Sequence, residues 1–393
     1  MATSGPAVCT EADTASQDPQ GSVGWMRIAL VSPLIESVPP RFYGGTERVV
    51  AYLANSLGAL GHRVTVFASG DSTVDAEVVP VCAHALRLDP SCQDALPHLI
   101  LGIERVLERV ENFDIVHFHT DFCHFSAFRR AGVPWLNTVH GRLDLPDLPP
   151  LYAAFPDVAV VSISNAQRAP LPNLNWLATV HHGLPRDHLP FTQQPGKYLA
   201  FLGRICREKR PDRAIEIARR TDIPLKMAAK VDRVDQAYFE QAIQPLLDPG
   251  VVEFIGEIGE TDKADFLGNA KALLFPIDWP EPFGLVLIEA MACGTPVVAF
   301  RAGSVPEIVE PGRTGYVVDT LDEAVARTLQ IDRLDRATVR AEFEARFTSD
   351  RMAEDYLSIY AGVITAQHAD ARRPGTGPCP YPCPVPGRMP EGR

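Results

Sequence analysis

Two kinds of hydrophobic pattern alternate along most of the chain. Short continuous apolar runs, typical of strands buried on both faces, are separated by segments with an apolar residue every three or four positions, which is the helical period. In the first half, the predicted strands are residues 26–32, 62–67, 114–119, 134–141, 158–163 and 178–181. The predicted helices are a segment that follows Glu47 and ends at Gly61, and residues 96–110 and 125–131. This alternation predicts a parallel, doubly wound sheet.

The pattern lapses over residues 185–196, which we interpret as an interdomain linker. A second series follows, with strands predicted at residues 197–202, 225–228, 251–255, 272–275, 297–300 and 316–318. One predicted helix of this series begins at residue 211, and the others cover residues 284–292, 321–329 and 341–364. We therefore predict a first domain at residues 25–185, a second at 197–335 and C-terminal helices at 336–366. Residues 1–24 and 367–393 have no periodic apolar pattern, so a disordered leader and a disordered Pro-rich tail are predicted.

One predicted helix of the second domain carries a single charge. In the apolar segment that starts at Gly284 only Glu289 is charged, and a helix that is apolar on every face is buried. Helical side chains tilt toward the N-terminus, so Glu289 points back to the loop that carries Glu281. Both carboxylates then converge on the free amides of Phe283, Gly284 and Leu285, which favour an anion. This combination suits a nucleotide sugar; the alternative is that Glu281 is solvated and Glu289 pairs with a core arginine.

Basic residues follow the first strand of the second domain. Arg204 and Lys209 flank the turn after residues 197–202, at the edge of the sheet where parallel strands end and ligands bind. Positive side chains in such a turn are natural phosphate ligands. The alternative is a solvated basic turn, because Arg207 and Arg210 lie in the same segment.

Glycine and histidine mark the corresponding edge of the first domain. Gly45 is the second of two consecutive glycines after the first strand, where a missing side chain lets the backbone approach a ligand, although paired glycines also serve plain turns. His119, His140 and His182 fall at strand ends and are too scattered in sequence to indicate a metal site. His140 is the best catalytic candidate, because Gly141 follows it and leaves it uncrowded.

Composition narrows the class of protein. The 393 residues are 46% hydrophobic and 22% charged, with a net charge of -12. These values are typical of a globular protein with two domains, and the acidic balance argues against a nucleic-acid partner. No apolar run approaches the roughly 20 residues that span a bilayer, and the N-terminus lacks the regions of a signal peptide. We therefore predict a cytoplasmic protein with no membrane surface indicated. The eight cysteines have no metal-site spacing.

Taken in order, these motifs resemble those of the family 4 retaining glycosyltransferases. The resemblance covers residues 26–364, and its most specific part is the stretch from Glu281 to Glu289 followed by Gly294, Thr295 and Pro296. It implies the GT-B fold, in which two doubly wound Rossmann-like α/β domains face a cleft and the C-terminal helices, here residues 336–366, pack back on the first domain. It also implies transfer of a hexose from a nucleotide-diphosphate sugar to an acceptor that the sequence does not identify.

The resemblance assigns expected roles to these residues. Glu289 would accept hydrogen bonds from the ribose and Glu281 from the hydroxyls of the sugar. Arg204 and Lys209 would bind the diphosphate, together with the amides of residues 283–285. His140 would lie near the reacting sugar, as a catalytic residue with Glu281. Gly45 would let the backbone approach the diphosphate or the acceptor.

The chemistry that follows needs no metal and no further cofactor. Cationic side chains and a helix N-terminus stabilise the leaving phosphate, and the sequence has no Asp-x-Asp pair of the kind that holds a divalent metal. Two alternatives stay open: a nucleotide-sugar epimerase of the same fold, and a non-catalytic nucleotide-sugar-binding protein. One departure concerns residues 227–232, where the family usually has a glycine-rich turn and this chain has Lys230. Lys230 would replace a backbone contact or be solvated.

Overall fold

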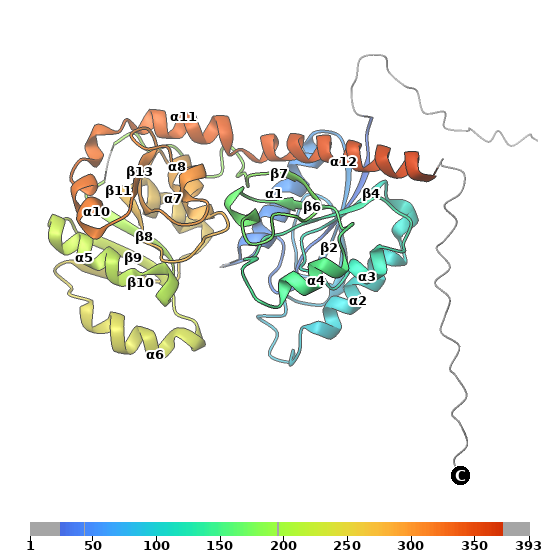
Figure 1. Ribbon diagram of the computed structural model, residues 1–393. Coiled ribbons are helices and arrows are strands. Elements are labelled where there is room, and N and C mark those ends of the chain that lie inside the picture. Colours follow the sequence, from blue (N-terminus) through green and yellow to red (C-terminus); the bar gives the residue numbers. More distant parts are fainter. Residues whose placement is uncertain (1–23, 43, 195, 372–393) are drawn as a thin grey trace, which may run out of the picture.

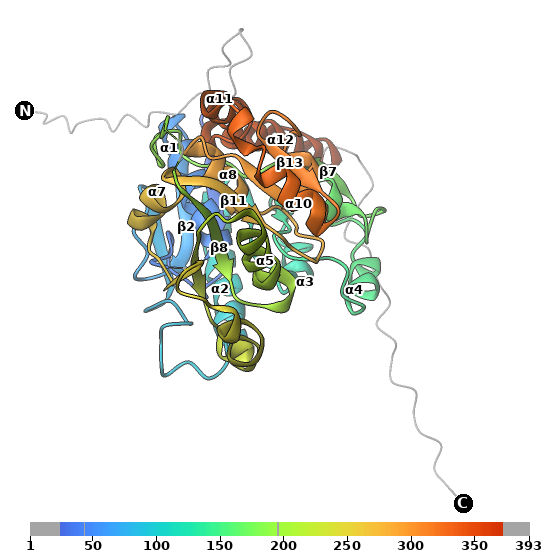
Figure 2. The same ribbon diagram turned by 90° about the vertical axis from the view of Figure 1, so that its left-hand side faces the viewer.

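The computed structural model describes residues 24–371 apart from residues 43 and 195. The leader and tail expected to be disordered therefore lie almost entirely outside the described residues. The described chain forms two lobes side by side, each built on a parallel sheet flanked by helices (Figure 1). In a view turned by 90°, the lobe of the second sheet lies in front of the other (Figure 2).

The first lobe holds a seven-stranded sheet in the order β3-β2-β1-β4-β5-β6-β7, and every pair is parallel. Its strands are β1 (Arg27–Val31), β2 (Arg63–Ser69), β3 (Glu77–Cys82), β4 (Ile115–Phe118), β5 (Trp135–Thr138), β6 (Val160–Ser162) and β7 (Trp176–Thr179). Its helices are α1 (Gly45–Ala59), α2 (Leu96–Leu107), α3 (Phe125–Phe128) and α4 (Leu148–Ala154). The sequence did not predict β3, since this half-exposed edge strand contains Pro80 and has no buried run.

The second lobe holds a six-stranded parallel sheet in the order β10-β9-β8-β11-β12-β13. Its strands are β8 (Tyr198–Arg204), β9 (Leu225–Lys230), β10 (Val252–Gly256), β11 (Ala270–Phe275), β12 (Val297–Phe300) and β13 (Gly315–Val318). Its helices are α5 (Pro211–Thr221), α6 (Gln236–Tyr238), α7 (Glu260–Gly268), α8 (Leu285–Ala292), α9 (Val305–Ile308) and α10 (Leu321–Thr328). The two doubly wound lobes confirm the predicted fold class. The sequence did not predict α7, which has only a weak amphipathic pattern.

The C-terminal segment corrects the prediction of one helix over residues 341–364. It forms α11 (Arg336–Arg346) and α12 (Ser349–Ala371), separated by two residues. Helix α11 stays with the second lobe, where Arg340 Nη1 donates to the carbonyl of Ala292 at 2.6 Å. Helix α12 returns across the first lobe and packs on α1, where Ser56 Oγ donates to Ser349 Oγ at 2.9 Å (Figure 1). Only the second of the two helices therefore packs back.

The boundary of the predicted disordered tail was also wrong. Residues 367–371 belong to α12, and Gln367 Nε2 donates to the carbonyl of Gly132 at 2.7 Å. That contact ties the end of the helix to the first lobe. No helix of the described part of the chain is long and apolar enough to cross a membrane.

The chain crosses between the lobes twice, and the two crossings lie side by side. The amide of Leu184 donates to the carbonyl of Phe347 at 2.9 Å, and the amide of Ser349 donates to the carbonyl of Leu184 at 2.8 Å. A Cβ atom on Gly183 would lie 2.1 Å from the carbonyl oxygen of Thr348, so only glycine allows this approach. The paired crossings connect the two lobes on one side. The edges of the two sheets face each other opposite this connection.

Candidate active site

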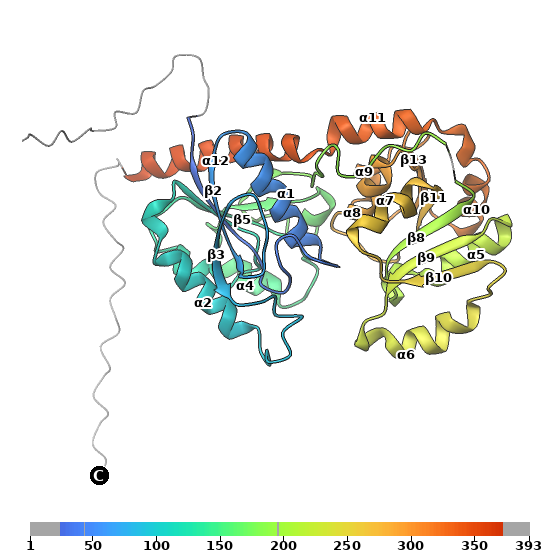
Figure 3. The same cartoon turned by 180° about the vertical axis from the view of Figure 1, so that it is seen from behind.

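A cavity of about 510 Å³ lies between the lobes, at the C-terminal edges of both sheets. Seen from behind, α1 of the first lobe faces α7 and α8 of the second (Figure 3). Every residue to which the family resemblance assigned a role lines this cavity: Gly45, His140, Arg204, Lys209, Glu281, Phe283, Gly284, Leu285 and Glu289. They come from four separate stretches of the chain, at residues 45, 140, 204–209 and 281–289, which only the fold brings together.

Helix α8 begins at the cavity because Gly284 breaks the preceding backbone. Gly284 has φ +82°, which glycine adopts without strain, and a Cβ atom there would lie 3.3 Å from Phe275 Cζ. The helix has no side-chain cap. Its first amides therefore remain available for an anion in the cavity, at the positive end of the helix dipole.

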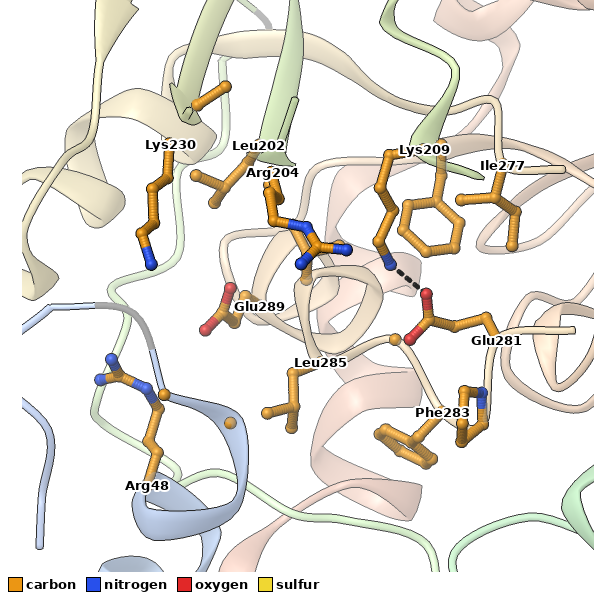
Figure 4. A pocket seen from close by; sticks show the side chains of 18 of the residues that line it. Arg48, Leu202, Arg204, Lys209, Lys230, Ile277, Glu281, Phe283, Leu285 and Glu289 are labelled. Carbon is orange, nitrogen blue, oxygen red and sulfur yellow. Dashed lines mark hydrogen bonds and ion pairs between the residues drawn. The ribbon is translucent and has the colours of Figure 1, made fainter. Parts of the chain in front are cut away.

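Glu281 is held by two donors, so the solvated alternative is wrong. Its side chain is 12% exposed and forms an ion pair through Oε2 with the Lys209 ammonium (Figure 4). The indole Nε1 of Trp279 donates to the same oxygen at 3.1 Å. Lys209 and Glu281, which the sequence assigned to the diphosphate and the sugar, are thus direct partners.

Glu289 is buried, and its partner is not a core arginine. Its side chain is 5% exposed, and Oε1 accepts from Lys263 Nζ at 2.7 Å. The same ammonium lies 3.2 Å from Glu260 Oε2. Sequence reasoning missed Lys263 because it lies on α7, whose weak pattern gave no signal. Figure 4 shows Glu289 between Arg204 and Leu285, facing the cavity.

Two further cations line the second-lobe side of the cavity, and acidic residues hold both. Arg204 lies 3.6 Å from both Asp232 and Asp235, and Lys230 Nζ lies 2.6 Å from Asp232 Oδ1. Lys230 points into the cavity (Figure 4), so it is not simply a solvated surface residue. In contrast, Arg210 pairs with Asp212 and with Asp278, and it is not among the lining residues.

His140 belongs to a buried cluster of histidines. Its Nε2 lies 2.9 Å from His119 Nδ1, and its ring stacks on His182 with centroids 5.2 Å apart. Burial lowers the pKa of His140 to about 3, so the imidazole is neutral at physiological pH. His119 in turn lies against His117, with ring centroids 3.9 Å apart.

Tyrosines of the returning helix complete this cluster. Tyr360 OH lies 2.7 Å from His117 Nδ1, and Thr138 Oγ1 lies 2.7 Å from His117 Nε2. Tyr356 OH bonds to the same threonine hydroxyl at 2.9 Å. No sequence signal could have found the tyrosines, because α12 is far from these strands along the chain.

A second network joins the lobes beside the cavity. Arg48 of α1 forms an ion pair with Glu260 of α7, whose Oε1 lies 2.6 Å from His188 Nε2. The hydroxyl of Tyr52 lies 2.9 Å from the same His188 nitrogen. Burial raises the pKa of Glu260, but the His188 hydrogen bond and the charges of Lys263 and Arg48 outweigh it and lower the pKa to about 2. Glu260 is therefore ionised at every physiological pH.

No group of three or more histidine, cysteine, aspartate or glutamate side chains within the described ranges could hold a metal ion. The charged groups of the cavity are instead paired cations and carboxylates around a helix N-terminus. A two-lobed α/β protein with such a cavity belongs to the GT-B class by its architecture.

Comparison with known proteins gives the particular family. Residues 43–168 match the family described as "Glycosyltransferase Family 4", and residues 190–335 match "Glycosyl transferases group 1". The chain is 27% identical to a D-inositol 3-phosphate glycosyltransferase of Arthrobacter sp. over 70% of this chain and 78% of that protein. It is 24% identical to an N-acetyl-alpha-D-glucosaminyl L-malate synthase of Bacillus anthracis, over 82% and 94% of the two chains. The chain belongs to the family 4 glycosyltransferases and is a glycosyltransferase.

Solved structures agree on the fold. The Anabaena protein HepE in complex with UDP-glucose superposes with a TM-score of 0.67 at 16% sequence identity, covering 86% of this chain and all of that one. At this level of identity the similarity establishes the GT-B architecture of the two lobes.

Proposed function

We propose that this protein is a retaining glycosyltransferase that moves a hexose from a nucleotide-diphosphate sugar to an acceptor hydroxyl without a metal ion. The observation that carries the proposal is the cavity itself, where two carboxylates, Glu281 and Glu289, flank the N-terminus of α8 opposite Arg204 and Lys209. The carboxylates suit the hydroxyls of a donor, while the cations and helix amides suit its phosphates. HepE, which shares the fold, was crystallised with UDP-glucose, a donor of this kind.

The two carboxylates bind different parts of the donor. Glu289 is fixed by Lys263 through one oxygen, and its other oxygen accepts hydrogen bonds from the ribose. Glu281 is fixed through Oε2 by Lys209 and Trp279, and its other oxygen accepts from the sugar hydroxyls. The diphosphate lies between them, against the first amides of α8 and Arg204, and Lys230 adds positive charge beside Arg204.

Bond cleavage at the sugar develops negative charge on the leaving phosphate. Arg204, Lys209 and the α8 amides stabilise that charge without reorganisation, which is the role that a metal ion would otherwise have. The bond from the anomeric carbon to the phosphate oxygen breaks, and the acceptor oxygen bonds to the same face of that carbon. The acceptor proton passes to the leaving phosphate oxygen. The neutral His140 lies beside the sugar and offers a hydrogen bond without a competing charge.

The acceptor is a separate question. The two relatives named above act, by their names, on inositol 3-phosphate and malate, which are both anionic.

The experiment is a thermal-shift and turnover screen of the full chain. UDP-glucose, UDP-galactose, UDP-N-acetylglucosamine, GDP-mannose and ADP-glucose are tested first, because a ligand present well above its dissociation constant raises the melting temperature. The stabilising donor is then incubated with and without candidate acceptors and with excess EDTA, and products are read by NMR. We expect release of the nucleoside diphosphate, an unchanged anomeric configuration and no effect of EDTA.

Each other outcome contradicts a stated part of the proposal. Inversion of the anomeric centre refutes retention, and activity that EDTA removes and magnesium restores refutes metal independence. A changed sugar without transfer identifies an epimerase. Binding of a donor with no turnover under any condition identifies a nucleotide-sugar-binding protein.

A further inference from the structure

Trp279 lies in the loop between β11 and α8 and lines the donor cavity, although no sequence motif singled it out. Its indole Nε1 donates to Glu281 Oε2 at 3.1 Å, and the Lys209 ammonium reaches the same oxygen. No hydrogen bond from the described residues reaches the other oxygen, Oε1. The carboxylate is therefore held at one oxygen and open at the other.

The indole also fixes the second donor to Glu281. Lys209 Nζ lies 5.0 Å from the centroid of the Trp279 ring and 5.5 Å from that of Phe275, within the range of cation–π attraction. Arg142, from the loop after β5 in the first lobe, lies 5.6 Å from the same indole centroid. Trp279 thus contacts the carboxylate, its counter-ion and the opposite lobe.

The backbone of Glu281 is fixed independently of Trp279's side chain. The amide of Ser304 donates to the carbonyl of Glu281 at 3.0 Å, and Ser304 Oγ donates to the carbonyl of Phe283 at 2.8 Å. Gly303 lies directly beneath, where a Cβ atom would be 2.2 Å from the Glu281 carbonyl oxygen. With the main chain held in this way, the remaining freedom of Glu281 is the orientation of its carboxylate. Both donors to that carboxylate, the indole N–H and the Lys209 ammonium, act at Oε2.

We propose that Trp279 is a positioning residue that turns Glu281 Oε1 toward the donor sugar. This inference rests on the proposed function, in which Glu281 binds the sugar hydroxyls. Without the indole donor, the Lys209 ammonium alone holds the carboxylate, which is then free to rotate toward the lysine with both oxygens. The sugar loses its fixed hydrogen-bond acceptor at the reacting end, while the nucleotide contacts at Glu289 are unchanged. A misplaced reacting group lowers kcat more than it weakens binding.

The test compares the kcat values of two variants. Which variant keeps the higher kcat depends on whether the N–H or the apolar ring of Trp279 positions Glu281. Trp279→Phe keeps an aromatic ring and removes the donor. Trp279→His is smaller, but its imidazole overlays the five-membered ring of indole and places Nε2 where indole has Nε1. Trp176→Phe is the matched control, since Trp176 Nε1 donates to the carbonyl of Leu171 at 3.0 Å in the first lobe, and Trp176 does not line the cavity.

Turnover is measured as donor hydrolysis or transfer with whichever of the five nucleotide sugars the parent protein uses. For Trp279→Phe we expect kcat to fall about 10- to 100-fold, the range for a lost hydrogen bond to a charged group, with donor KM within about threefold. Trp279→His should retain more kcat than Trp279→Phe. Trp176→Phe should match the parent in kcat.

A second readout needs no substrate. The indole N–H resonance that disappears from the NMR spectrum of Trp279→Phe is that of Trp279, and it should move upfield in Glu281→Ala, where its charged acceptor is gone. The inference is overturned if Trp279→Phe equals the parent in kcat, if it exceeds Trp279→His, or if the resonance does not move. A parent protein that turns over no nucleotide sugar refutes the proposed function instead, and the positioning role with it.

Discussion

The ammonium of Lys263 lies 2.7 Å from Oε1 of Glu289 and 3.2 Å from Oε2 of Glu260. Because Glu260 also pairs with Arg48 of the other lobe, a continuous series of alternating charges runs from Glu289 in the cavity to the first lobe. The carboxylate expected to bind the donor and the contact that joins the two lobes therefore share one lysine.

Replacing Glu289 tests its role toward the donor. Glu289→Gln keeps the size of the side chain, and Lys263 retains Glu260, so the apo melting temperature should fall by only a few degrees. Donor KM should rise about tenfold, the effect of roughly 1.4 kcal/mol, with kcat changed less, because the ribose does not react. Steady-state kinetics and thermal melts measure these values.

The control is Glu342→Gln on α11, a buried glutamate that pairs with Arg313 at 2.7 Å outside the cavity. It should leave donor KM unchanged. A Glu289→Gln protein that is strongly destabilised without ligand yet binds donor normally would show that Glu289 stabilises the fold and does not bind the donor.

The interlobe ion pair predicts that replacing two different arginines changes the stability of the protein by different amounts. Arg48 is 4% exposed, and Arg48→Met leaves the half-buried Glu260 with one cation fewer, so we expect a loss of about 2–4 kcal/mol in the free energy of unfolding. Arg63→Met removes an exposed pair 3.9 Å from Glu77 and should cost less than about 1 kcal/mol. Urea unfolding measures both. Equal losses for the two variants would show that the network does not stabilise the contact between the lobes.

The four clustered histidines and the separate, buried His124 predict sensitivity to acid. Burial lowers the pKa of His140 to about 3 and holds the pKa values of His117, His119, His124 and His182 well below 6.5. In the unfolded chain each takes up a proton as the pH falls below about 6.5, while in the folded protein each stays neutral. The stability is therefore complete above that pH and is lost progressively as the pH falls below about 6.5, by up to about 1.4 kcal/mol per pH unit for each histidine that stays neutral in the folded protein.

His124→Phe isolates a buried histidine that lies outside the cluster, among aromatic side chains. The His124 ring stacks on Phe118 with centroids 3.7 Å apart and planes inclined by 7°, and its Nε2 has no hydrogen-bond partner within the described structure. The variant should fold, and its unfolding free energy should fall less steeply between pH 6 and pH 4 than that of the parent. Parallel pH dependences for parent and variant would contradict a buried neutral histidine at this position.

Gly303 predicts a coupling between loop packing and turnover. Gly303→Ala must move the Glu281 backbone, since the new Cβ would lie 2.2 Å from its carbonyl oxygen, and φ at this position is +51°. A residue other than glycine in such a backbone conformation costs about 1–3 kcal/mol. We therefore expect a melting temperature several degrees lower. Because the Glu281 backbone moves, we also expect a kcat at least tenfold lower. Gly141→Ala has nothing within 4 Å of its Cβ atom and should melt like the parent. A Gly303→Ala protein with normal kcat would show that the loop tolerates displacement.

The amino-acid sequence by itself determined the two-domain class and the place of the site. Periodicity gives strands and helices because it depends on neighbours a few residues apart, and parallel strands bring their C-terminal ends to one edge. The candidates of each domain therefore lie at one edge of its sheet, and the packing of the two lobes brings both edges to one cavity. The break between α11 and α12 was not predictable in this way, since it depends on the passage of Leu184 beside Phe347.

Only the tertiary structure decided which groups those candidates contact. Tyr360 reaches His117 from 243 positions away, Arg48 reaches Glu260 from 212, and Glu281 pairs with Lys209 from 72. Local patterns carry no information on such pairs, because each depends on how two lobes and a returning helix pack. The sequence thus places carboxylates and cations at one sheet edge, and packing determines that each carboxylate is held at one oxygen, because a buried charge is stable only beside its partner.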